Sequence, residues 1–369
     1  MTRVFLAGAG YIAREHATAA TDRSILTGEV ELHVADPDPE ALASFVAAFP
    51  AAVPHPDARS MFATRHDESD LAVIATPPDS HHALVRDALD AGLHTLCEKP
   101  LALTADEAAD LARRADAAGR ILASCDDRFR DLATTQAARR LDASGALGRV
   151  YHATFVNTFR RARTGFDQLT QSAWFRDPRI AGGGVMMDWG PYDIAVLDEI
   201  LDPVRVDVRH AWATGPITGG PFGDQSALSE QHVGAVFDVH TRAGAVVPVS
   251  YERAAATHGA ERSLVQLEGD RAAVSWDWLD WLGDGSVRLT SDDDGEPDTV
   301  TTRFAASPIG FHARPLARIA AAVRDGADPR AITHRSLFTF AWLRAVLDCA
   351  AAGEPVTVEL DALAGSVVS

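Results

Sequence analysis

The chain has 369 residues, carries a formal net charge of −18 and is 47% apolar. This length favours two domains, and the negative charge repels nucleic acid and anionic membranes, so we expect neither as a partner. No apolar run reaches the roughly 18 residues of a membrane span, and no signal peptide precedes the first strand. Cys97, Cys125 and Cys349 are too few and too dispersed for a disulfide framework or a zinc cluster. The sequence therefore indicates a globular protein of the reducing cytoplasm, and it assigns no metal.

Residues 1–36 have the pattern of a strand, a glycine turn, a helix and a second strand. Gly8 permits the tight turn, and Gly10 lets a pyrophosphate approach the backbone. Ala13 is the small third residue of a G-x-G-x-x-G/A pattern, which follows a strand and opens a helix, as dinucleotide binding requires. The intervening residues, Tyr11 and Ile12, are assigned to the same cofactor site.

Asp36 stands at the tip of the second strand. A carboxylate there accepts a hydrogen bond from a ribose 2′-hydroxyl and repels a 2′-phosphate, so the sequence favours NAD over NADP. The alternative is a turn or helix cap, because Pro37-Asp38-Pro39 follows and turn chemistry also selects aspartate.

Strand and helix patterns alternate as far as residue 125, which predicts a parallel sheet with helices on both faces. Two of its buried strands end in Thr76-Pro77 and in Glu98-Lys99. Ligands of open α/β sheets lie outside the carboxyl ends of the strands, so both pairs are candidate cofactor contacts. His81, which follows the first of these turns, is a further cofactor candidate, although a single histidine at a helix start also serves structural roles.

Lys99 is the only lysine, and the other 33 of the 34 cations are arginine. An amine is compact and can relay a proton, whereas a guanidinium is planar and stays charged. The pattern therefore favours a catalytic or cofactor-adjacent amine at position 99. The alternative is a surface lysine that has no function and was retained by chance. The motif in which the residue lies, Glu98-Lys99-Pro100, disfavours this alternative.

The second half of the chain predicts an α+β domain with many strands. Alternating runs occur at residues 148–159, 204–212, 232–240, 245–251, 264–268, 272–276 and 299–304. Amphipathic helices are predicted at 311–324 and 335–352. We therefore expect two consecutive domains, 1–126 binding the dinucleotide and 127–369 binding substrate and mediating oligomerisation.

Three glycines, 182–184, precede Asp188 and Tyr192. The two polar residues are four apart, so on one helix they share a face, and Pro191 is tolerated if it lies in the first turn. They are therefore candidates to act on one substrate. The structural alternative is a helix-capping aspartate beside a half-buried aromatic residue.

In their order along the chain, these motifs resemble the glucose–fructose oxidoreductase, inositol dehydrogenase and rhizopine catabolism (Gfo/Idh/MocA) oxidoreductases. The matching runs are Gly8–Ala13, Ala75–His81, Ala91–Leu101 and Gly182–Gly184 with Asp188. The resemblance spans nearly the whole chain. It implies an N-terminal Rossmann domain followed by an α+β domain built on a large, open, mainly antiparallel sheet. It also implies hydride transfer between a nicotinamide cofactor and a secondary alcohol or ketone of a sugar, cyclitol or sugar-derived metabolite.

By this resemblance Lys99, Asp188 and the residue four positions later form the catalytic set. The family usually has histidine at that last position, whereas this chain has Tyr192, which is similar to the tyrosine-containing branch. A free phenol is a poor base at neutral pH, because its pKa is about 10. The ammonium of Lys99 would favour the phenolate. We therefore expect Tyr192 to exchange the proton, Lys99 to stabilise the oxyanion and Asp188 to orient a substrate hydroxyl, with Lys99 as an alternative proton carrier.

Further substrate-binding candidates are Arg128, at the domain junction, and Asn157, Trp174 and Arg176, upstream of the glycines. His312 is a weaker one. Two other functions remain open: a glycoside-cleaving enzyme with transient redox chemistry, and a nucleotide-sensing regulator without catalysis. An exposed face of the open sheet makes a homodimer or homotetramer the expected assembly.

Overall fold

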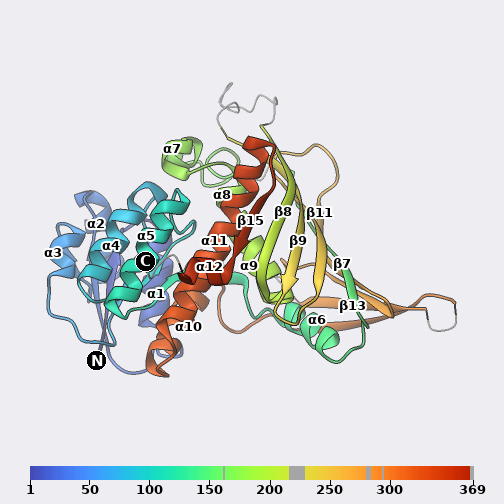
Figure 1. Cartoon of the computed structure of the whole chain (residues 1–369). Coiled ribbons are helices and arrows are strands. Elements are labelled where there is room, and N and C mark those ends of the chain that lie inside the picture. The colour runs from blue at the N-terminus through green and yellow to red at the C-terminus, as the bar shows by residue number, and fades with distance from the viewer. Residues whose placement is uncertain (161–162, 216–228, 280–283, 293–294, 366–369) are drawn as a thin grey trace. The chain divides into compact units, whose positions relative to one another are not determined.

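The computed structural model describes residues 1–160, 163–215, 229–279, 284–292 and 295–365. They form two compact units, coloured along the chain in Figure 1. Unit 1 consists chiefly of Met1–Arg128 and Ile309–Phe340, and unit 2 chiefly of Phe129–Pro308 and Ala341–Ala362. This division differs from two consecutive domains, because residues 309–340 cluster with unit 1.

Unit 1 is built on a six-stranded sheet with the strand order β3-β2-β1-β4-β5-β6. All of its strand pairs are parallel. The strands are β1 (Thr2–Ala7), β2 (Val30–Ala35), β3 (Val53–His55), β4 (Leu71–Ile74), β5 (His94–Cys97) and β6 (Leu122–Ser124). The direction of progression reverses between β1 and β4, the point at which doubly wound sheets bind ligands. The predicted Rossmann architecture is confirmed.

Helices cover this sheet. They are α1 (Tyr11–Thr21), α2 (Pro39–Ala48), α3 (Ala58–Phe62), α4 (His81–Asp90), α5 (Ala105–Ala118), α10 (Arg314–Arg324) and the first part of α11 (Pro329–Ala352), with 3₁₀ turns η1 (Pro78–Ser80) and η2 (Cys125–Phe129). Local sequence fixes several ends. Thr104 and Glu107 form a reciprocal capping box at the start of α5, and Gly119 ends that helix in the left-handed conformation.

Residues 309–340 complete the core of unit 1. Leu316 and Ile319 are buried in the hydrophobic cluster that also contains side chains of β1 and β4. The backbone N–H of Leu122, at the start of β6, donates to the Thr333 hydroxyl at 3.0 Å. The predicted amphipathic helices exist here, but the first of them packs with the N-terminal unit.

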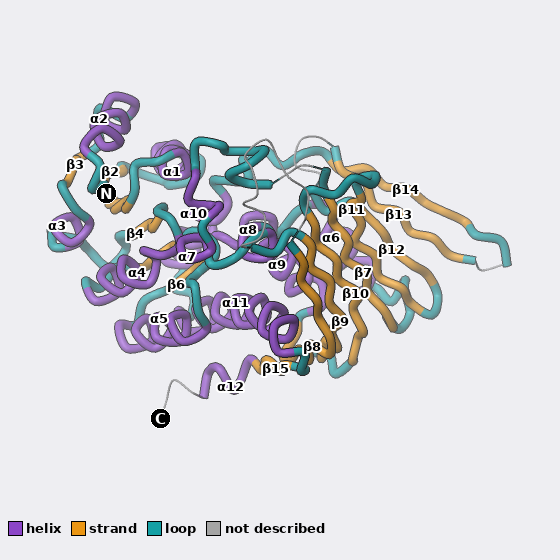
Figure 2. The backbone as a smooth tube through the Cα atoms, turned by 90° about the horizontal axis from the view of Figure 1, so that it is seen from above, coloured by secondary structure: helices purple, strands orange, loops and turns teal. Residues whose placement is uncertain are grey.

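Unit 2 is built on a nine-stranded sheet with the order β14-β13-β12-β11-β7-β10-β9-β8-β15, which Figure 2 shows from above. Only the β7–β10 pair is parallel, and the other pairs are antiparallel. The strands are β7 (Val150–Thr158), β8 (Pro203–Thr214), β9 (His232–Thr241), β10 (Val246–Ala254), β11 (Arg262–Gly269), β12 (Ala272–Trp276), β13 (Gly285–Ser291), β14 (Asp298–Phe304) and β15 (Val356–Glu359). The predicted large, mainly antiparallel sheet is confirmed, and β13 and β15 are the two strands that the pattern did not mark.

One face of this sheet is buried. Alternate residues of β9 and β10, such as Phe237 and Tyr251, are enclosed, and Phe237 packs edge-on against Trp342 of α11. The helices of unit 2 are α6 (Ala133–Ala143), η3 (Ala173–Arg176), α7 (Pro178–Ala181), α8 (Val185–Asp188), α9 (Gly190–Leu201) and the later part of α11, with α12 (Leu360–Gly365) following β15. On the opposite sheet face Trp212, Val236 and Val246 are exposed. Across the described ranges, no helix is both long enough and apolar enough to cross a bilayer.

Five histidines of unit 1 predict a loss of stability in acid. They are His33, His55, His81, His94 and His312, and burial lowers the pKa of each. Because the unfolded chain then binds protons more readily, their contribution is complete above the unfolded pKa of about 6.5 and is lost as the pH falls. The pKa of His312 is about 3, so this residue alone should cost unit 1 roughly 2 kcal/mol between pH 6.5 and 5.

We therefore expect the thermal midpoint to fall between pH 7 and 5. In a His312→Asn variant the midpoint should fall less steeply with pH. Scanning calorimetry of both proteins across this range tests the prediction, and parallel slopes would contradict it.

Candidate active site

The glycine turn of unit 1 has no room for a side chain at Gly8. Its φ is +105°, and a Cβ there would lie 2.5 Å from the carbonyl oxygen of Ala75. At Gly10, by contrast, a Cβ would meet no heavy atom of the described chain within 4 Å. The helix α1 begins directly afterwards without a side-chain cap. Unsatisfied helix N–H groups beside open space suit a pyrophosphate, so these residues fit a dinucleotide.

Asp36 is already part of this turn. Its Oδ2 accepts a hydrogen bond from the backbone N–H of Ala9 at 2.8 Å, and its Oδ1 accepts one from the N–H of Asp38, also at 2.8 Å. The turn role that the sequence offered as an alternative is therefore present. Each carboxylate oxygen has further acceptor capacity, so a ribose hydroxyl can share the same group.

His81 joins two turns of the candidate cofactor site. Its Nδ1 lies 2.8 Å from the carbonyl oxygen of Pro100, and its Nε2 lies 2.9 Å from that of Thr76. The side chain is fully buried. His81 was predicted to contact the cofactor, but both ring nitrogens face backbone carbonyls. Its contribution is to hold the Thr76-Pro77 turn against the Glu98-Lys99-Pro100 turn.

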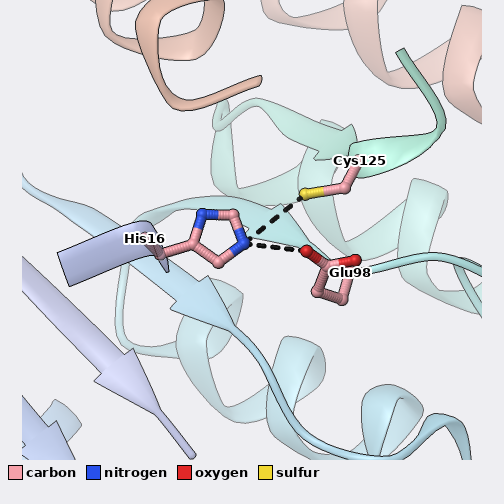
Figure 3. A group of neighbouring side chains, drawn as sticks. All are labelled: His16, Glu98 and Cys125. Atoms are coloured by element: carbon pink, nitrogen blue, oxygen red, sulfur yellow. Dashed lines mark hydrogen bonds and ion pairs between the residues drawn. The ribbon is translucent and has the colours of Figure 1, made fainter. Parts of the chain in front are cut away.

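Glu98 is the centre of a buried charge network, and Figure 3 shows it with two of its neighbours, His16 and Cys125. Its Oε1 accepts hydrogen bonds from His16 Nε2, at 2.8 Å, and from the guanidinium of Arg128. The Cys125 thiol lies 4.0 Å from the same histidine nitrogen. Burial alone would raise the pKa of Glu98, but Arg128, His16 and Lys99 outweigh it and hold that pKa well below its usual range.

Arg128 was predicted to bind substrate. In the structure its side chain is buried and paired with Glu98. The local sequence around either residue gave no signal of this pairing, because the two residues are 30 positions apart and meet only where β5 and β6 lie side by side. We therefore assign Arg128 to the support of the Glu98-Lys99 turn.

His16, Glu98 and Cys125 offer three potential metal ligands within 4.8 Å of one another. Metal binding needs the thiolate form of cysteine, whereas burial raises the pKa of the Cys125 thiol. A divalent cation would also have to displace the Arg128 guanidinium from Glu98 Oε1. The donor set therefore suits a buried ion pair better than a metal ion.

Lys99 follows this network directly. Its backbone N–H donates to Glu98 Oε2 at 3.2 Å, and its side chain is half-buried. Because Glu98 is held in place by the network, this hydrogen bond also fixes the backbone of Lys99, the only lysine of the chain. His312 approaches from residues 309–340 and meets the ring of Tyr11 edge-on at 6.3 Å. The histidine thereby brings the returning segment to the dinucleotide turn, a contact that the sequence did not indicate, since it marked His312 only as a weaker substrate candidate.

In unit 2 the three glycines accommodate Glu230. Its carboxylate accepts hydrogen bonds from the N–H groups of Gly184, at 2.9 Å, and Met186, at 3.1 Å, and its backbone carbonyl accepts one from Val185. A Cβ at position 184 would lie 1.8 Å from that carbonyl oxygen. Glu230 therefore caps the start of α8, a role that no local motif revealed.

Replacing Gly184 by alanine should be strongly destabilising. The added Cβ meets backbone atoms, so the segment containing Glu230 or the start of α8 must shift. We expect a loss of about 3 kcal/mol or more, the range of severe steric and capping defects. The urea midpoint of unit 2 measures this loss. The neighbouring Gly183→Ala variant is the matched control, because its nearest contact is the flexible Met187 side chain, and equal losses in both would contradict the explanation.

Asp188 and Tyr192 do not share one uninterrupted helix. Asp188 ends α8, Trp189 intervenes, and Tyr192 is the third residue of α9. Pro191 lies in the first turn of α9, where its missing N–H is tolerated, whereas a helix continuing from α8 through position 191 would need that N–H. The Thr164 hydroxyl donates to Asp188 Oδ2, which orients that carboxylate.

The ring of Tyr192 is buried in an aromatic group. It contacts Phe129 edge-on at 4.9 Å and Trp189 at 5.8 Å. The following residue, Asp193, is fully buried and forms a two-pronged ion pair with Arg253, with Nε donating to Oδ2 at 2.7 Å. This pair was missed because its members are distant in sequence.

The remaining substrate candidates differ in their surroundings. Asn157, on β7, is completely buried. Trp174 is stacked on Phe175, with ring centroids 3.7 Å apart. A Cβ at Gly165 would lie 3.4 Å from Arg176 Cγ, so η3 packs beside the loop that carries Thr164, the partner of Asp188. The structure thus brings η3 close to Asp188 within unit 2.

Comparisons with known proteins agree with the motifs. Residues 2–125 match the family described as an oxidoreductase family with an NAD-binding Rossmann fold, and residues 135–274 match the GFO/IDH/MocA C-terminal domain. The chain is 31% identical to D-xylose 1-dehydrogenase (NADP(+)) 2 of Haloferax volcanii, over 80% of this chain and 82% of the relative. It is 25% identical to 1,5-anhydro-D-fructose reductase of Ensifer adhaerens, over 97% and 99% respectively.

Solved structures share the fold. Levoglucosan dehydrogenase in complex with NADH and levoglucosan superposes with a TM-score of 0.76 at 18% identity, covering 98% of this chain and 100% of that one. An inositol dehydrogenase homologue complexed with NAD⁺ from Azotobacter vinelandii gives 0.74 at 22% identity, covering 97% of each chain. The chain therefore belongs to the GFO/IDH/MocA family of oxidoreductases.

Proposed function

We propose that this protein is an NAD(P)-dependent dehydrogenase or reductase acting on a secondary alcohol or ketone of a sugar, cyclitol or sugar-derived metabolite. The observation that carries the proposal lies in unit 1, where a glycine turn suited to a pyrophosphate and the supported Glu98-Lys99 turn follow strands of the same parallel sheet. The names of the relatives, a xylose dehydrogenase and an anhydrofructose reductase, support the substrate class.

The proposed mechanism assigns one task to each polar group. When bound, the nicotinamide accepts or delivers the hydride. Oxidation also requires that the carbinol proton leaves and that the developing oxyanion is stabilised. We assign the proton transfer to Tyr192, the oxyanion stabilisation to Lys99 and the orientation of the hydroxyl to Asp188. Direct proton transfer by Lys99 is the alternative.

For the cofactor we propose NAD in preference to NADP. Asp36 places a carboxylate beside the glycine turn, where a 2′-phosphate would meet like charge. The fluorescence of NADH and NADPH on titration with protein tests this preference. We expect NADH to bind more tightly than NADPH. An Asp36→Ser variant should have a smaller difference between the two affinities. Equal affinities of the wild-type protein for NADH and NADPH would contradict the assignment.

The function itself is tested by NADH formation. Purified protein is supplied with NAD⁺ or NADP⁺ and with a panel of free sugars, cyclitols and glycosides, and absorbance at the NADH band is followed. Turnover with a polyol supports the proposal. Bound cofactor without NADH formation on any member, combined with release of free sugar from a glycoside, would replace it by the transient-redox hydrolase.

We also propose a homodimer or homotetramer located in the cytoplasm. The support for assembly is the sheet face of unit 2 on which Trp212, Val236 and Val246 are exposed. The three cysteines are free and buried, which suits a reducing compartment. Light scattering coupled to size exclusion measures the assembly, and a monomer at micromolar concentration would contradict it.

A further inference from the structure

Three neighbouring side chains of unit 2 leave polar atoms unpaired. They are Asn157, with both its amide nitrogen and oxygen, Arg253, with Nη1, and Trp278, with Nε1. All three side chains are fully buried. None of these four atoms has a hydrogen-bond partner among the residues that the structure describes. Buried polar groups are nearly always paired in native proteins, so a group of unpaired ones calls for a partner from outside the chain.

The three residues lie together on the buried face of the sheet. Asn157 and Arg253 are direct partners on the parallel strands β7 and β10, which run side by side in Figure 2. The guanidinium carbon of Arg253 lies 5.8 Å from the ring centroid of Trp278. An unpaired indole N–H group also occurs at Trp276, so the tryptophan alone would carry little weight, and the inference depends on the group of three.

The group is linked to the segment that carries Tyr192. Nε and Nη2 of Arg253 hold Asp193, the residue after that tyrosine, while its guanidinium carbon lies 5.6 Å from the ring centroid of Trp189. Only Nη1 remains for another partner. The network therefore presents its unused donors near the start of α9.

We propose that Asn157, Arg253 and Trp278 form a subsite that binds adjacent hydroxyl groups of the substrate, away from the carbon that is oxidised. This inference rests on the proposed function and extends it by adding Arg253 and Trp278 to the substrate-binding residues. The four atoms are enclosed, so side-chain rotation accompanies binding.

The numbers of unpaired hydrogen-bond donors and acceptors indicate which functional groups the ligand should carry. The unpaired atoms offer five N–H donors and a single acceptor atom, the Asn157 oxygen. Vicinal hydroxyls provide several acceptor oxygens together with a proton for that acceptor. A carboxylate fits less well, because Asp193 already neutralises Arg253 and a second anion would be buried without compensation.

Two substitutions remove the unpaired groups with little change of shape, namely Asn157→Leu and Trp278→Phe. Tyr251→Phe is the matched control, because the Tyr251 hydroxyl already donates to Asp193 at 2.7 Å. Losing an unpaired buried group should keep or raise the melting temperature, by about 2–4 °C for Asn157→Leu, whereas Tyr251→Phe should lower it. A purely structural role for Asn157 or Trp278 predicts a lower melting temperature instead.

The binding readout uses NAD⁺-saturated protein and the polyol panel. For the polyol that turns over, each substitution at 157 or 278 should raise KM about tenfold, with a smaller effect on kcat, while Tyr251→Phe keeps the wild-type KM. At a concentration near the wild-type KM, the same polyol should raise the melting temperature of the wild type and leave that of the two variants nearly unchanged.

The outcomes separate the two proposals. If the wild type oxidises a polyol but both variants keep its KM, the subsite is wrong and the function stands. If no polyol turns over, yet polyols stabilise the wild type and not the variants, the subsite stands and the function is wrong. If polyols neither react nor stabilise, both are wrong.

Discussion

Replacing Lys99 by methionine should lower kcat/KM by a factor of about 100 or more, the scale of a lost acid–base or oxyanion-stabilising group. Methionine preserves the length of the side chain and removes the ammonium, while the backbone N–H that donates to Glu98 remains. Cofactor binding should therefore be retained. Steady-state kinetics on the substrate found in the panel, with NADH binding followed by fluorescence, measure both quantities. Full turnover by Lys99→Met would remove Lys99 from the catalytic set.

Lys99→Arg is the informative companion. Arginine keeps the positive charge but neither titrates near neutral pH nor matches the compact ammonium. If Lys99 exchanges a proton, or if its ammonium must closely approach the substrate oxyanion, the arginine variant should be nearly as slow as the methionine variant. Near-wild-type activity of Lys99→Arg would show that a positive charge alone suffices, which would leave proton transfer to Tyr192.

Replacing Arg128 by methionine should have the largest effect on stability. It leaves the buried carboxylate of Glu98 without its arginine partner, and breaking a buried ion pair from one side typically costs about 3–5 kcal/mol. The low pKa of Glu98 means that its stabilising contribution is present above the unfolded pKa, about 4.5, and is lost as the pH falls below it. The difference in the free energy of unfolding between variant and wild type should therefore be large at pH 7 and smaller near pH 4.

Urea denaturation at the two pH values measures this gap. A double variant, Arg128→Met with Glu98→Gln, is the control, because it removes both members of the pair and should recover part of the lost stability. If Arg128 instead served the substrate, Arg128→Met would fold with normal stability and show only a raised KM.

Much of unit 1 was predictable from sequence because its signals are local. The turn at Gly8 and Gly10, the apolar strands and the motif at Glu98-Lys99 each occupy a few consecutive residues, and their geometry follows from backbone chemistry. The order of the parallel strands then follows from the doubly wound topology. The resemblance to the family extended the same prediction to the sheet of unit 2.

The supporting contacts were not predictable because they join residues that are distant in sequence. Nothing near Glu98 indicates that His16 will reach it, and nothing near Gly184 indicates Glu230. The break at Trp189 is a different case. Pro191 was recognised, but whether a proline lies within the first turn or ends a helix depends on the preceding backbone. An amphipathic pattern likewise shows that a helix has a buried face without showing which core receives it.

The return of residues 309–340 to unit 1 has a consequence for synthesis of the chain. The N-terminal sheet leaves the ribosome long before Leu316 and Ile319, which fill its core, have been made. At a rate of about 5–20 residues per second, the interval between residues 128 and 340 lasts roughly 10–40 s. During this time the nascent sheet of unit 1 exposes an apolar face. Unit 2 likewise lacks Ala341–Ala362 until the end of synthesis, so neither core is complete earlier and both apolar faces need protection by chaperones.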